Sequence, residues 1–354
     1  MKFTIKQKTF NSLLSRVVSL ANQKSQLPIA QNVRIECNSD IILITATDLD
    51  SFISCKCECP TVYNGATTVP AHMLYDIVKK TPSDRDIEFT QEDDFVTLKS
   101  GRSRYKLPCL SSDDFPSIPS GSFESSFSIE SSLIVESIEK SLFAICNDDS
   151  RYYLTGLSIL SNGNELKVSS TDGNRISRST YKINCDNFSV IVPKKSAMEI
   201  KKIASNSCDV NISLSKSLIK IESADVEYVS RLIDGEFPDL DRVIPSQNNN
   251  KVIVETKSMI ECLERISISA NDKSKSIKLK ITQNKIEITT QNGYEELLCN
   301  YDGNDILSGF NSSYLLDILK NIDNKDTALL FKDGSSPLLV NNSNSQYVLM
   351  PIRI

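Results

Sequence analysis

The sequence predicts an α+β protein built from three copies of one unit, each with two helices packed on antiparallel strands. Three observations support this prediction. The chain has 354 residues, more than one ordinary hydrophobic core holds. A short strand pattern leads into a helical pattern at Phe3, Phe127 and Val252, at spacings of 124 and 125 residues (127 − 3 and 252 − 127). A second helical pattern follows in each copy.

The first copy opens with a strand pattern at 3–6. The helix after it has its apolar side chains on one face, at the spacing of an amphipathic helix. These side chains are Phe10, Leu13, Leu14, Val17 and Val18. Residues 41–45 and 95–98 are typical of strands. The second helix is predicted at 69–80, where Val-Pro opens it because proline is favoured near the first turn.

The second and third copies repeat this order. The apolar faces of their first helices are Ile134, Ile138, Leu142 and Ile145, and then Ile260, Leu263 and Ile266. Their second helices are predicted at 192–203, again behind Val-Pro, and at 310–322. Lysine collects near the end of all three second helices, where the helix dipole favours a cation. Because element order and spacing recur together, chance similarity explains the pattern poorly.

The ends of the copies are also alike, and they set the predicted boundaries. The run RYKL at 104–107 precedes Phe115-Pro116, and YVSRL at 228–232 precedes Phe237-Pro238. A Ser/Pro-rich stretch and a polar run then separate the units. The predicted domains are 1–122, 123–247 and 248–354. A contact that repeats head to tail either closes such an array into a ring or extends it as a filament.

Charge and histidine content argue against two classes of function. The net charge of −5 is unusual for a protein that binds DNA tightly or by sequence, although a locally basic surface remains compatible with it. The second helix of the second copy has four lysines and one glutamate, a run that is also typical of a solvated helix face. The single histidine, His72, leaves no Ser-His or Cys-His pair for acid–base catalysis.

The ten cysteines are predicted to be reduced and structural. Cys55, Cys57 and Cys59 lie at i, i+2 and i+4, so a strand would place all three thiols on one face. Neither a CxxC turn nor a neighbouring histidine accompanies them, which argues against a metal site. We therefore expect no metal and no cofactor.

The opening residues MKFTIKQKTF lack the apolar run of a signal peptide. No later segment approaches the length that a membrane span requires. We therefore expect a cytoplasmic protein with no membrane partner.

Eight motifs run in order along the chain: LPI at 27–29, TDL at 47–49, GATTVP at 65–70, SGRSR at 100–104, RYYLTG at 151–156, TDGNRI at 171–176, FPD at 237–239 and MPIRI at 350–354. Together they resemble the β sliding clamp family of bacterial DNA polymerase III. The resemblance implies three DNA-clamp domains per subunit and a six-domain ring of two head-to-tail subunits. It implies a protein that encircles duplex DNA and confers processivity on the replicative polymerase, with no chemistry of its own.

The resemblance also implies a pocket for partner peptides, apolar in character and with polar groups from an arginine and the backbone. The matching residues are Leu154, Thr171, Gly173, Arg175, Ile176, Pro238, Val243, Ser336, Val348, Met350, Pro351, Ile352 and Arg353. Asn174 stands where many relatives have histidine, and Ile352 and Ile354 replace commoner Met and Leu. These differences keep the pocket apolar. Its implied partners are the replicative polymerase subunit, the clamp loader, and other polymerases and repair proteins that carry a clamp-binding motif.

Two more surfaces are implied by the resemblance. The implied contacts to duplex DNA, independent of sequence, are Lys24, Arg151, Tyr152, Tyr153, Lys194 and Lys195. Asp148 replaces a glutamine and weakens the case for a contact there. The implied homodimer interface brings Arg102, Arg104 and Leu107 of one subunit to Ile268, Glu295 and Glu296 of the other. Ser269 falls where an apolar residue is familiar, which favours a weaker interface.

Two other functions stay open on the residues alone. One is an enzyme that uses a carboxylate such as Asp172 in Thr-Asp-Gly, although that tripeptide is more typical of a turn between strands. The other is a repeat-built adaptor that shares the peptide pocket but never closes around DNA. The size of the protein in solution distinguishes the adaptor from the ring.

Overall fold

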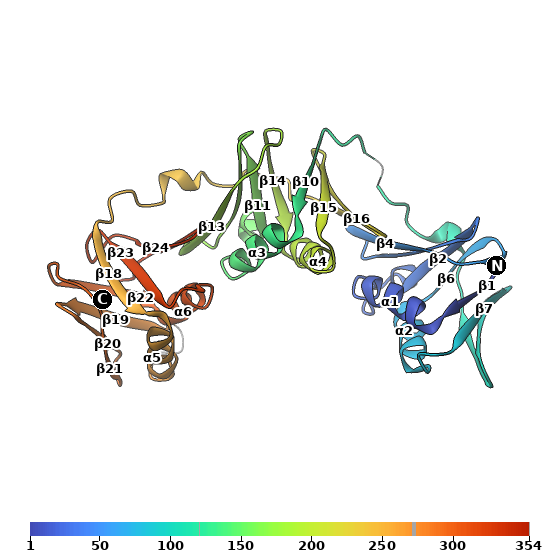
Figure 1. The fold of residues 1–354 in the computed structure, drawn as a ribbon, viewed down its shortest axis with the longest axis horizontal. Coiled ribbons are helices and arrows are strands. Elements are labelled where there is room, and N and C mark those ends of the chain that lie inside the picture. Colours follow the sequence, from blue (N-terminus) through green and yellow to red (C-terminus); the bar gives the residue numbers. More distant parts are fainter. Residues whose placement is uncertain (120, 271–273, 354) are drawn as a thin grey trace. The chain divides into compact units, whose positions relative to one another are not determined.

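The computed structural model describes residues 1–119, 121–270 and 274–353 (Figure 1). Within these ranges the helices are α1 (Gln7–Val17), α2 (Ala71–Lys80), α3 (Ser131–Leu142), α4 (Lys194–Ala204), α5 (Thr256–Ile268) and α6 (Ser312–Leu319). Each predicted copy therefore supplies two helices, and the strands pair antiparallel throughout the described sheets. The α+β fold of three repeated units is confirmed.

The chain folds into two compact units. Unit 1 comprises residues 1–135 and 198–232, and unit 2 comprises residues 136–197 and 233–354. Each unit holds one outer repeat and part of the central repeat. The central repeat is divided because its strands join two different sheets, one in each unit.

Unit 1 has two sheets. The smaller sheet has the order β5 (Thr61–Tyr63), β1 (Lys2–Lys6), β7 (Asp86–Glu92), β8 (Phe95–Ser100), β9 (Ser103–Pro108). The larger sheet has the order β10 (Ser125–Glu130), β15 (Asp209–Leu214), β16 (Leu218–Ser223), β17 (Val226–Arg231), β4 (Ser51–Glu58), β3 (Ile41–Thr47), β2 (Asn32–Asn38), β6 (Gly65–Pro70). Helix α1 packs on α2 and on β3 and β4, and α2 packs on β2 and β6.

Unit 2 also has a larger and a smaller sheet. Its larger sheet has the order β14 (Phe188–Pro193), β11 (Gly156–Ser161), β12 (Glu165–Thr171), β13 (Arg175–Lys182), β25 (Ser345–Leu349), β24 (Leu338–Asn342), β23 (Asp326–Phe331), β18 (Asn250–Glu255). Its smaller sheet has the order β21 (Tyr294–Leu298), β20 (Lys285–Thr289), β19 (Ser276–Thr282), β22 (Ile306–Asn311). Helix α5 packs on α6 and β21, and α6 packs on β22 and β25.

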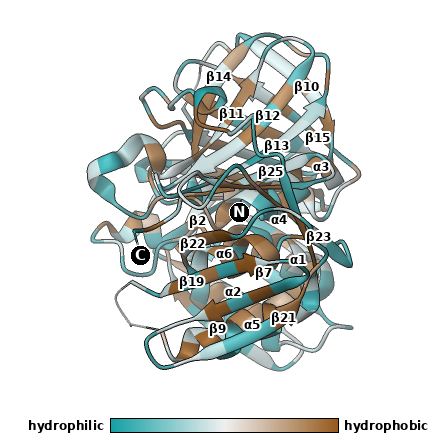
Figure 2. Ribbon diagram, turned by 90° about the vertical axis from the view of Figure 1, so that its left-hand side faces the viewer, coloured by the Kyte–Doolittle hydropathy of each residue, from teal (hydrophilic) through white to brown (hydrophobic). Residues whose placement is uncertain are grey.

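The alternation of apolar and polar residues along the strands builds the cores, and Figure 2 shows hydrophobic and hydrophilic segments alternating along several of them. In unit 1, Phe3, Phe10 and Phe89 are fully buried and join β1, α1 and β7. The rings of Phe3 and Phe89 stack at 4.7 Å, and Phe10 meets Phe3 edge to face at 6.1 Å. Such aromatic contacts add to the burial of apolar area and fix how the helix crosses the sheet.

Two details of the predicted elements are wrong. Val-Pro does not open the second helices: Pro70 and Pro193 are the last residues of β6 and β14, and each helix starts one residue later. The buried face of α5 is Met259, Cys262, Leu263 and Ile266, while Ile260 is only half-buried. Burial at i, i+3, i+4 and i+7 from Met259 matches the helical period better than a count from Ile260.

All ten cysteines are free thiols. Burial raises the pKa of the Cys37 and Cys55 thiols to about 12 and that of Cys59 to about 11. Because the thiolate is the reactive and metal-binding form, these thiols are poorly suited to either role. Within the described ranges, no helix combines the length and apolar character needed to cross a membrane.

Candidate functional site

The turn between β12 and β13 begins the predicted peptide pocket. The Thr171 hydroxyl donates to the carbonyl of Arg175 at 2.7 Å, and the backbone N–H of Gly173 donates back to that hydroxyl at 3.1 Å. Asp172 Oδ1 accepts the backbone N–H groups of Asn174 and Arg175 at 2.9 and 3.1 Å. Gly173 has φ +90°, which only glycine adopts readily. The Asp172 carboxylate is thus occupied in a turn, which accounts for Thr-Asp-Gly without a catalytic role.

The Arg175 side chain is bound by three hydrogen bonds within its own chain. Its Nε donates to Asp172 Oδ2 at 3.0 Å, one Nη donates to Asp317 Oδ2 at 2.6 Å, and the other donates to the carbonyl of Phe143 at 2.6 Å. The guanidinium also lies over the rings of Phe143 and Tyr314, at 5.1 and 4.1 Å. Its side chain is only 10% exposed. All three of its side-chain nitrogens therefore donate to partners inside the protein, and the side chain holds the turn in place.

An apolar cluster lies beside this turn. Its buried members are Ile176, Leu240, Leu339 and Val348, and Phe237, Ile244 and Leu330 pack against it. Ile176 on β13 is opposite Val348 on β25, so the strand register places two predicted pocket residues together. Val243 and Met350 are exposed, at 44% and 37%. The cluster therefore has a buried base and an apolar rim, which suits the apolar end of a short peptide.

The remaining predicted pocket residues lie in unit 2 as well. Leu154 and Thr171 are buried, Ser336, Pro351 and Ile352 are half-buried, and Gly173, Pro238 and Arg353 are exposed. The backbone N–H of Met350 donates to the carbonyl of Asn174 at 2.8 Å, and that of Ile352 donates to the carbonyl of Gly309 at 2.9 Å. These bonds tie the chain end to the turn and to β22.

Of the seven residues that form or flank the apolar cluster, only Ile176 and Val348 were predicted from the sequence as pocket residues. Leu240, with Phe237 and Ile244 beside it, lies in the segment that follows β17, and Leu339 and Leu330 lie on β24 and β23. The spacing of apolar residues from 237 to 244 after Phe-Pro was the available signal. For Leu330 and Leu339 there was none, because nothing local distinguishes a strand residue at a site from one in the core.

The same turn occurs in the first repeat, between β3 and β4. Thr47 Oγ1 donates to the carbonyl of Ser51 at 2.8 Å, and Asp48 Oδ1 accepts the N–H of Ser51 at 2.8 Å. Leu49 has φ +83° in the place of Gly173. Ser51 stands where the second repeat has Arg175, so the first repeat has the turn without the buried guanidinium.

The predicted DNA-contacting residues divide between the units. Arg151, Tyr152 and Tyr153 lie on a short 3-10 helix, η3 (Asp149–Leu154), in unit 2. Tyr152 is 54% exposed, and its ring meets Tyr153 edge to face at 5.7 Å. Arg151 donates to the Asp172 carbonyl at 2.8 Å and to Asp148 Oδ2 at 3.2 Å. At its surface, η3 therefore has the exposed Tyr152 and an Arg151 whose charge is partly neutralised by Asp148.

Asp148, which replaces a glutamine, has a structural role. Its carboxylate caps η3 by accepting the N–H of Ser150 at 3.1 Å and the Ser150 hydroxyl at 2.7 Å. These bonds, together with Arg151, lower the pKa of Asp148. It is a helix cap that also pairs with a predicted DNA contact.

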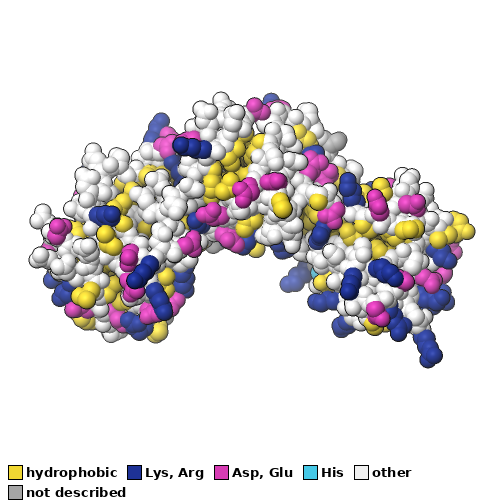
Figure 3. Space-filling view, in the orientation of Figure 1, with side chains coloured by type: hydrophobic (Ala, Val, Ile, Leu, Met, Phe, Trp, Pro, Cys, Tyr) yellow, Lys and Arg dark blue, Asp and Glu magenta, His cyan; other side chains and the backbone are white. Residues whose placement is uncertain are grey.

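The lysines lie on separate elements. Lys194 begins α4 and donates to Asn147 Oδ1 at 3.0 Å, and Lys195 beside it is exposed. Lys24 is exposed in unit 1, in the loop before the short 3-10 helix η1 (Pro28–Gln31). On the face that Figure 3 shows, Lys and Arg are interspersed with Asp and Glu. A mixed surface of this kind agrees with the net charge of −5.

The predicted dimer residues lie mostly on two edge strands. Arg104 and Leu107 are on β9, the edge of the smaller sheet of unit 1, and Arg102 is at the turn that precedes it. Glu295 and Glu296 are on β21, the edge of the smaller sheet of unit 2. An edge strand has unpaired N–H and C=O groups that another chain can bind.

Two of these predicted residues already have contacts within their own chain. Leu107 is completely buried in its own sheet and supports β9 from inside. Glu295 already accepts two hydrogen bonds from Arg265, at 2.9 and 2.8 Å. Large apolar side chains are also exposed in unit 2: Ile268 at 87% and Leu298 at 80%. Ser269 bonds to Thr290 and to the carbonyl of Ile266, both at 2.8 Å.

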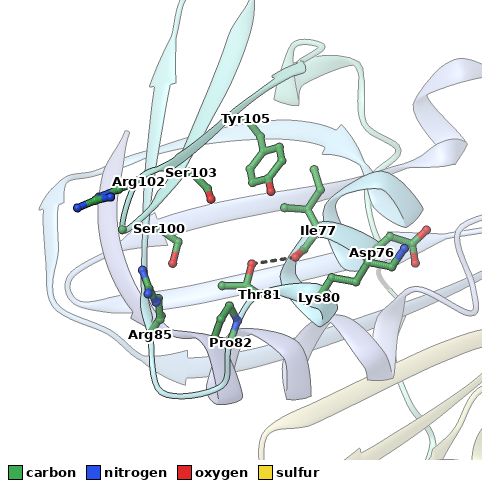
Figure 4. Close-up of a pocket in the computed structure, with 11 residues that line it drawn as sticks. Asp76, Ile77, Lys80, Thr81, Pro82, Arg85, Ser100, Arg102, Ser103 and Tyr105 are labelled. Carbon is green, nitrogen blue, oxygen red and sulfur yellow. Dashed lines mark hydrogen bonds between the residues drawn. The ribbon is translucent and has the colours of Figure 1, made fainter.

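A hollow of about 780 Å³ adjoins β9 (Figure 4). Ile77 of α2 and Tyr105 of β9 provide its apolar surface, and Arg85 and Arg102 provide cations at the hairpin end. The Thr81 hydroxyl donates to the carbonyl of Ile77 at 2.9 Å and closes the end of α2 beneath the hollow. An apolar side chain with an acidic neighbour would fit this surface.

Comparisons with known proteins cover the whole chain. Models of the DNA polymerase III beta subunit match residues 1–119 as its N-terminal domain, 128–239 as its central domain and 241–353 as its C-terminal domain. Beta sliding clamps of Pseudomonas aeruginosa and Caulobacter vibrioides are each 31% identical to it, with 100% of both chains covered.

Solved structures of sliding clamps are similar to this chain over its whole length. A DNA polymerase sliding clamp from Pseudomonas aeruginosa with a ligand matches with a TM-score of 0.96, at 31% identity over 100% of both chains. A DNA polymerase III subunit beta from Bartonella birtlesii, bound to griselimycin, also matches with a TM-score of 0.96, at 31% identity over 100% of both chains.

Proposed function

This chain belongs to the DNA polymerase III beta subunit family, the beta sliding clamps, and we infer that it encircles duplex DNA and tethers the replicative polymerase to it. The observation that carries this inference is the match of all three family domains, in order, along a chain that itself repeats one unit three times. Members of this family are non-catalytic processivity factors, and we propose that this chain also lacks chemistry of its own. We take its domains as 1–122, 123–247 and 248–354, and its compartment as the cytoplasm.

We propose that two copies close head to tail, with β9 of one subunit pairing with β21 of the other. Each edge would then complete a sheet that ends in unpaired backbone groups. Because Leu107 is buried and Glu295 is paired within its own chain, the contact relies on exposed apolar groups such as Ile268 and Leu298. The hollow beside Tyr105 is a suitable receptor for one of them. Arg102, Arg104 and Glu296 would then add specificity more than affinity.

The dimer is testable by mass. A chain of 39.4 kDa should give about 79 kDa (2 × 39.4) in chromatography with light scattering at micromolar concentration. Ile268→Lys should shift it toward the monomer, because a charge would be buried against an apolar surface. Val62→Lys, on the edge strand β5, changes a 59% exposed apolar residue elsewhere and should leave the mass unchanged. A monomeric wild type at moderate salt would exclude the ring and favour the adaptor.

We propose that DNA is held by topology, with weak contacts from Lys24, Arg151, Tyr152, Tyr153, Lys194 and Lys195. Lysine and arginine would meet phosphates, which carry no sequence information. Since the net charge is negative and Arg151 is partly neutralised by Asp148, direct affinity for linear duplex should be low. Such contacts let a clamp slide.

Lys194→Ala with Lys195→Ala tests these contacts. For linear duplex, the plot of log affinity against log salt concentration has a negative slope. The magnitude of this slope should decrease by about two, one for each lost phosphate contact. Retention on DNA should also shorten, while the melting temperature stays unchanged because both side chains lie on the surface of α4. The matched control is Lys251→Ala with Lys278→Ala, which removes two exposed lysines from the strands β18 and β19. An equal fall in the control would show that only net charge matters.

We propose that partners attach through the apolar cluster and its rim. A short peptide with a glutamine and terminal apolar residues would place its apolar side chains against the exposed Val243 and Met350, above the buried base that Ile176 and Val348 form. The polymerase subunit, the clamp loader, and other polymerases and repair proteins that carry the motif would compete for this one surface. A few buried side chains, less the cost of ordering the peptide, support roughly micromolar affinity, which lets partners exchange.

A further inference from the structure

The segment 237–244 carries two predicted pocket residues, Pro238 and Val243, and a charged contact beside them holds it to the sheet. Asp241 lies on the short 3-10 helix η4 (Leu240–Arg242). Arg178 of β13 donates to Asp241 Oδ1, and Lys167 of β12 donates to Asp241 Oδ2 at 3.4 Å. One carboxylate therefore joins η4 to two neighbouring strands.

Burial makes this contact different from an ordinary surface ion pair. The side chains of Arg178 and Lys167 are only 9% and 21% exposed, whereas that of Asp241 is 62% exposed. In the described part of the chain, Arg178 Nε has no hydrogen-bond partner. The loss of Asp241 would leave a buried guanidinium without a counter-charge, and such groups are costly to leave unpaired.

The alternation of side chains along β13 places the Arg178–Asp241 ion pair beside the apolar cluster. Ile176 and Arg178 are two residues apart on β13 and face the same side. Leu240 and Asp241 are neighbours on η4. Leu240 packs into the apolar cluster with Ile176, and Asp241 pairs with Arg178, so η4 is held at two adjacent points.

The residues directly after η4 depend on this attachment. The backbone N–H groups of Val243 and Ile244 both donate to the carbonyl of Leu240 at 3.0 Å. Asp239 caps η4 by accepting the N–H of Asp241 at 3.1 Å. The position of the exposed Val243 side chain is therefore set through Leu240 and Asp241.

We propose that Asp241 is a positioning residue for the partner-peptide surface, because its carboxylate holds η4 against β12 and β13 and so fixes where Pro238 and Val243 stand. This inference rests on the proposed peptide surface. The pKa of Asp241 is lowered, chiefly by the hydrogen bond from Arg178, in agreement with a carboxylate that stays charged in the contact.

Asp241→Asn should weaken binding of a fluorescent clamp-binding peptide about five-fold, because a looser η4 must be ordered when the peptide binds. Amide hydrogen exchange should rise at Val243 and Ile244, while the dimer mass stays unchanged. Asp241→Glu keeps the charge and should keep affinity within about two-fold. Glu236→Gln, a charge loss at an exposed position of the same connection, is the matched control and should have no effect.

A double-mutant cycle separates positioning from a general loss of stability. In an Arg178→Met background, Asp241→Asn should cause a clearly smaller further loss of affinity, because only the longer contact with Lys167 is then left to break. If Asp241→Asn alone leaves affinity and exchange unchanged, or if its effect is the same without Arg178, the inference is wrong. Val243→Arg tests the proposed surface itself: unchanged affinity in that variant would overturn the peptide site. Loss in Val243→Arg with no effect of Asp241→Asn would overturn the positioning role alone.

Discussion

Removal of residues 350–354 should abolish binding of clamp-binding peptides. Met350 forms part of the exposed rim of the apolar cluster, and Pro351 and Ile352 continue it beside β22. If these residues cover two or three apolar peptide side chains, each worth roughly 1.5–3 kcal/mol when fully buried, their loss removes most of a micromolar affinity. Fluorescence anisotropy with a labelled peptide measures the effect.

The truncation has clear controls. Dimer mass should be unchanged, because β9 and β21 lie on other parts of the chain. The melting temperature should fall only slightly, since the deletion spares Leu349 and the β13–β25 pairing. Met73→Ala and Met198→Ala alter exposed methionines on α2 and α4 and should leave peptide affinity unchanged. Normal affinity in the truncated protein would place the partner site elsewhere.

Arg175→Ala should produce the largest loss of stability. It leaves the carboxylates of Asp172 and Asp317 and the carbonyl of Phe143 without their shared partner, and it removes a cation that lies over two rings. Breaking a buried ion pair by removing one side typically costs about 3–5 kcal/mol. Because Asp317 is 42% exposed, water compensates part of this cost, and we expect the lower end of that range.

Differential scanning calorimetry checks this expectation. A loss of about 3 kcal/mol should lower the melting temperature of unit 2 by roughly 6–12 °C. Arg175→Lys should rescue little, because an ammonium cannot form the same fork of bonds or stack as a plane on the rings. Arg242→Ala removes an 85% exposed arginine that pairs with Asp239, and its melting temperature should match the wild type. An equally small change for Arg175→Ala would contradict its structural role.

Local patterns predicted the repeats and the helices well, because amphipathic faces and strand alternation are properties of short segments. The apolar face of α1 and the strand residue Phe3 are buried as predicted. Motif resemblance found Ile176 and Val348, which the register of β13 and β25 then brings together.

Long-range contacts were beyond such reasoning. Arg175 and Asp317 are 142 residues apart, and nothing local marks them as partners. Arg178, Lys167 and Asp241 were missed for the same reason. For the predicted dimer residues, a motif locates β9 and β21, but only packing shows that Leu107 is buried and that Arg265 already binds Glu295.

On the proposed function, the protein holds DNA by enclosing it. The most direct measurement loads the clamp onto nicked circular DNA with a clamp loader, isolates the complex by gel filtration, and then cuts the circle once. A topological clamp should remain on the circle in physiological salt and slide off once the DNA is linear, because its direct contacts are weak. Retention on linear DNA, or equal binding to linear DNA without the loader, would contradict enclosure.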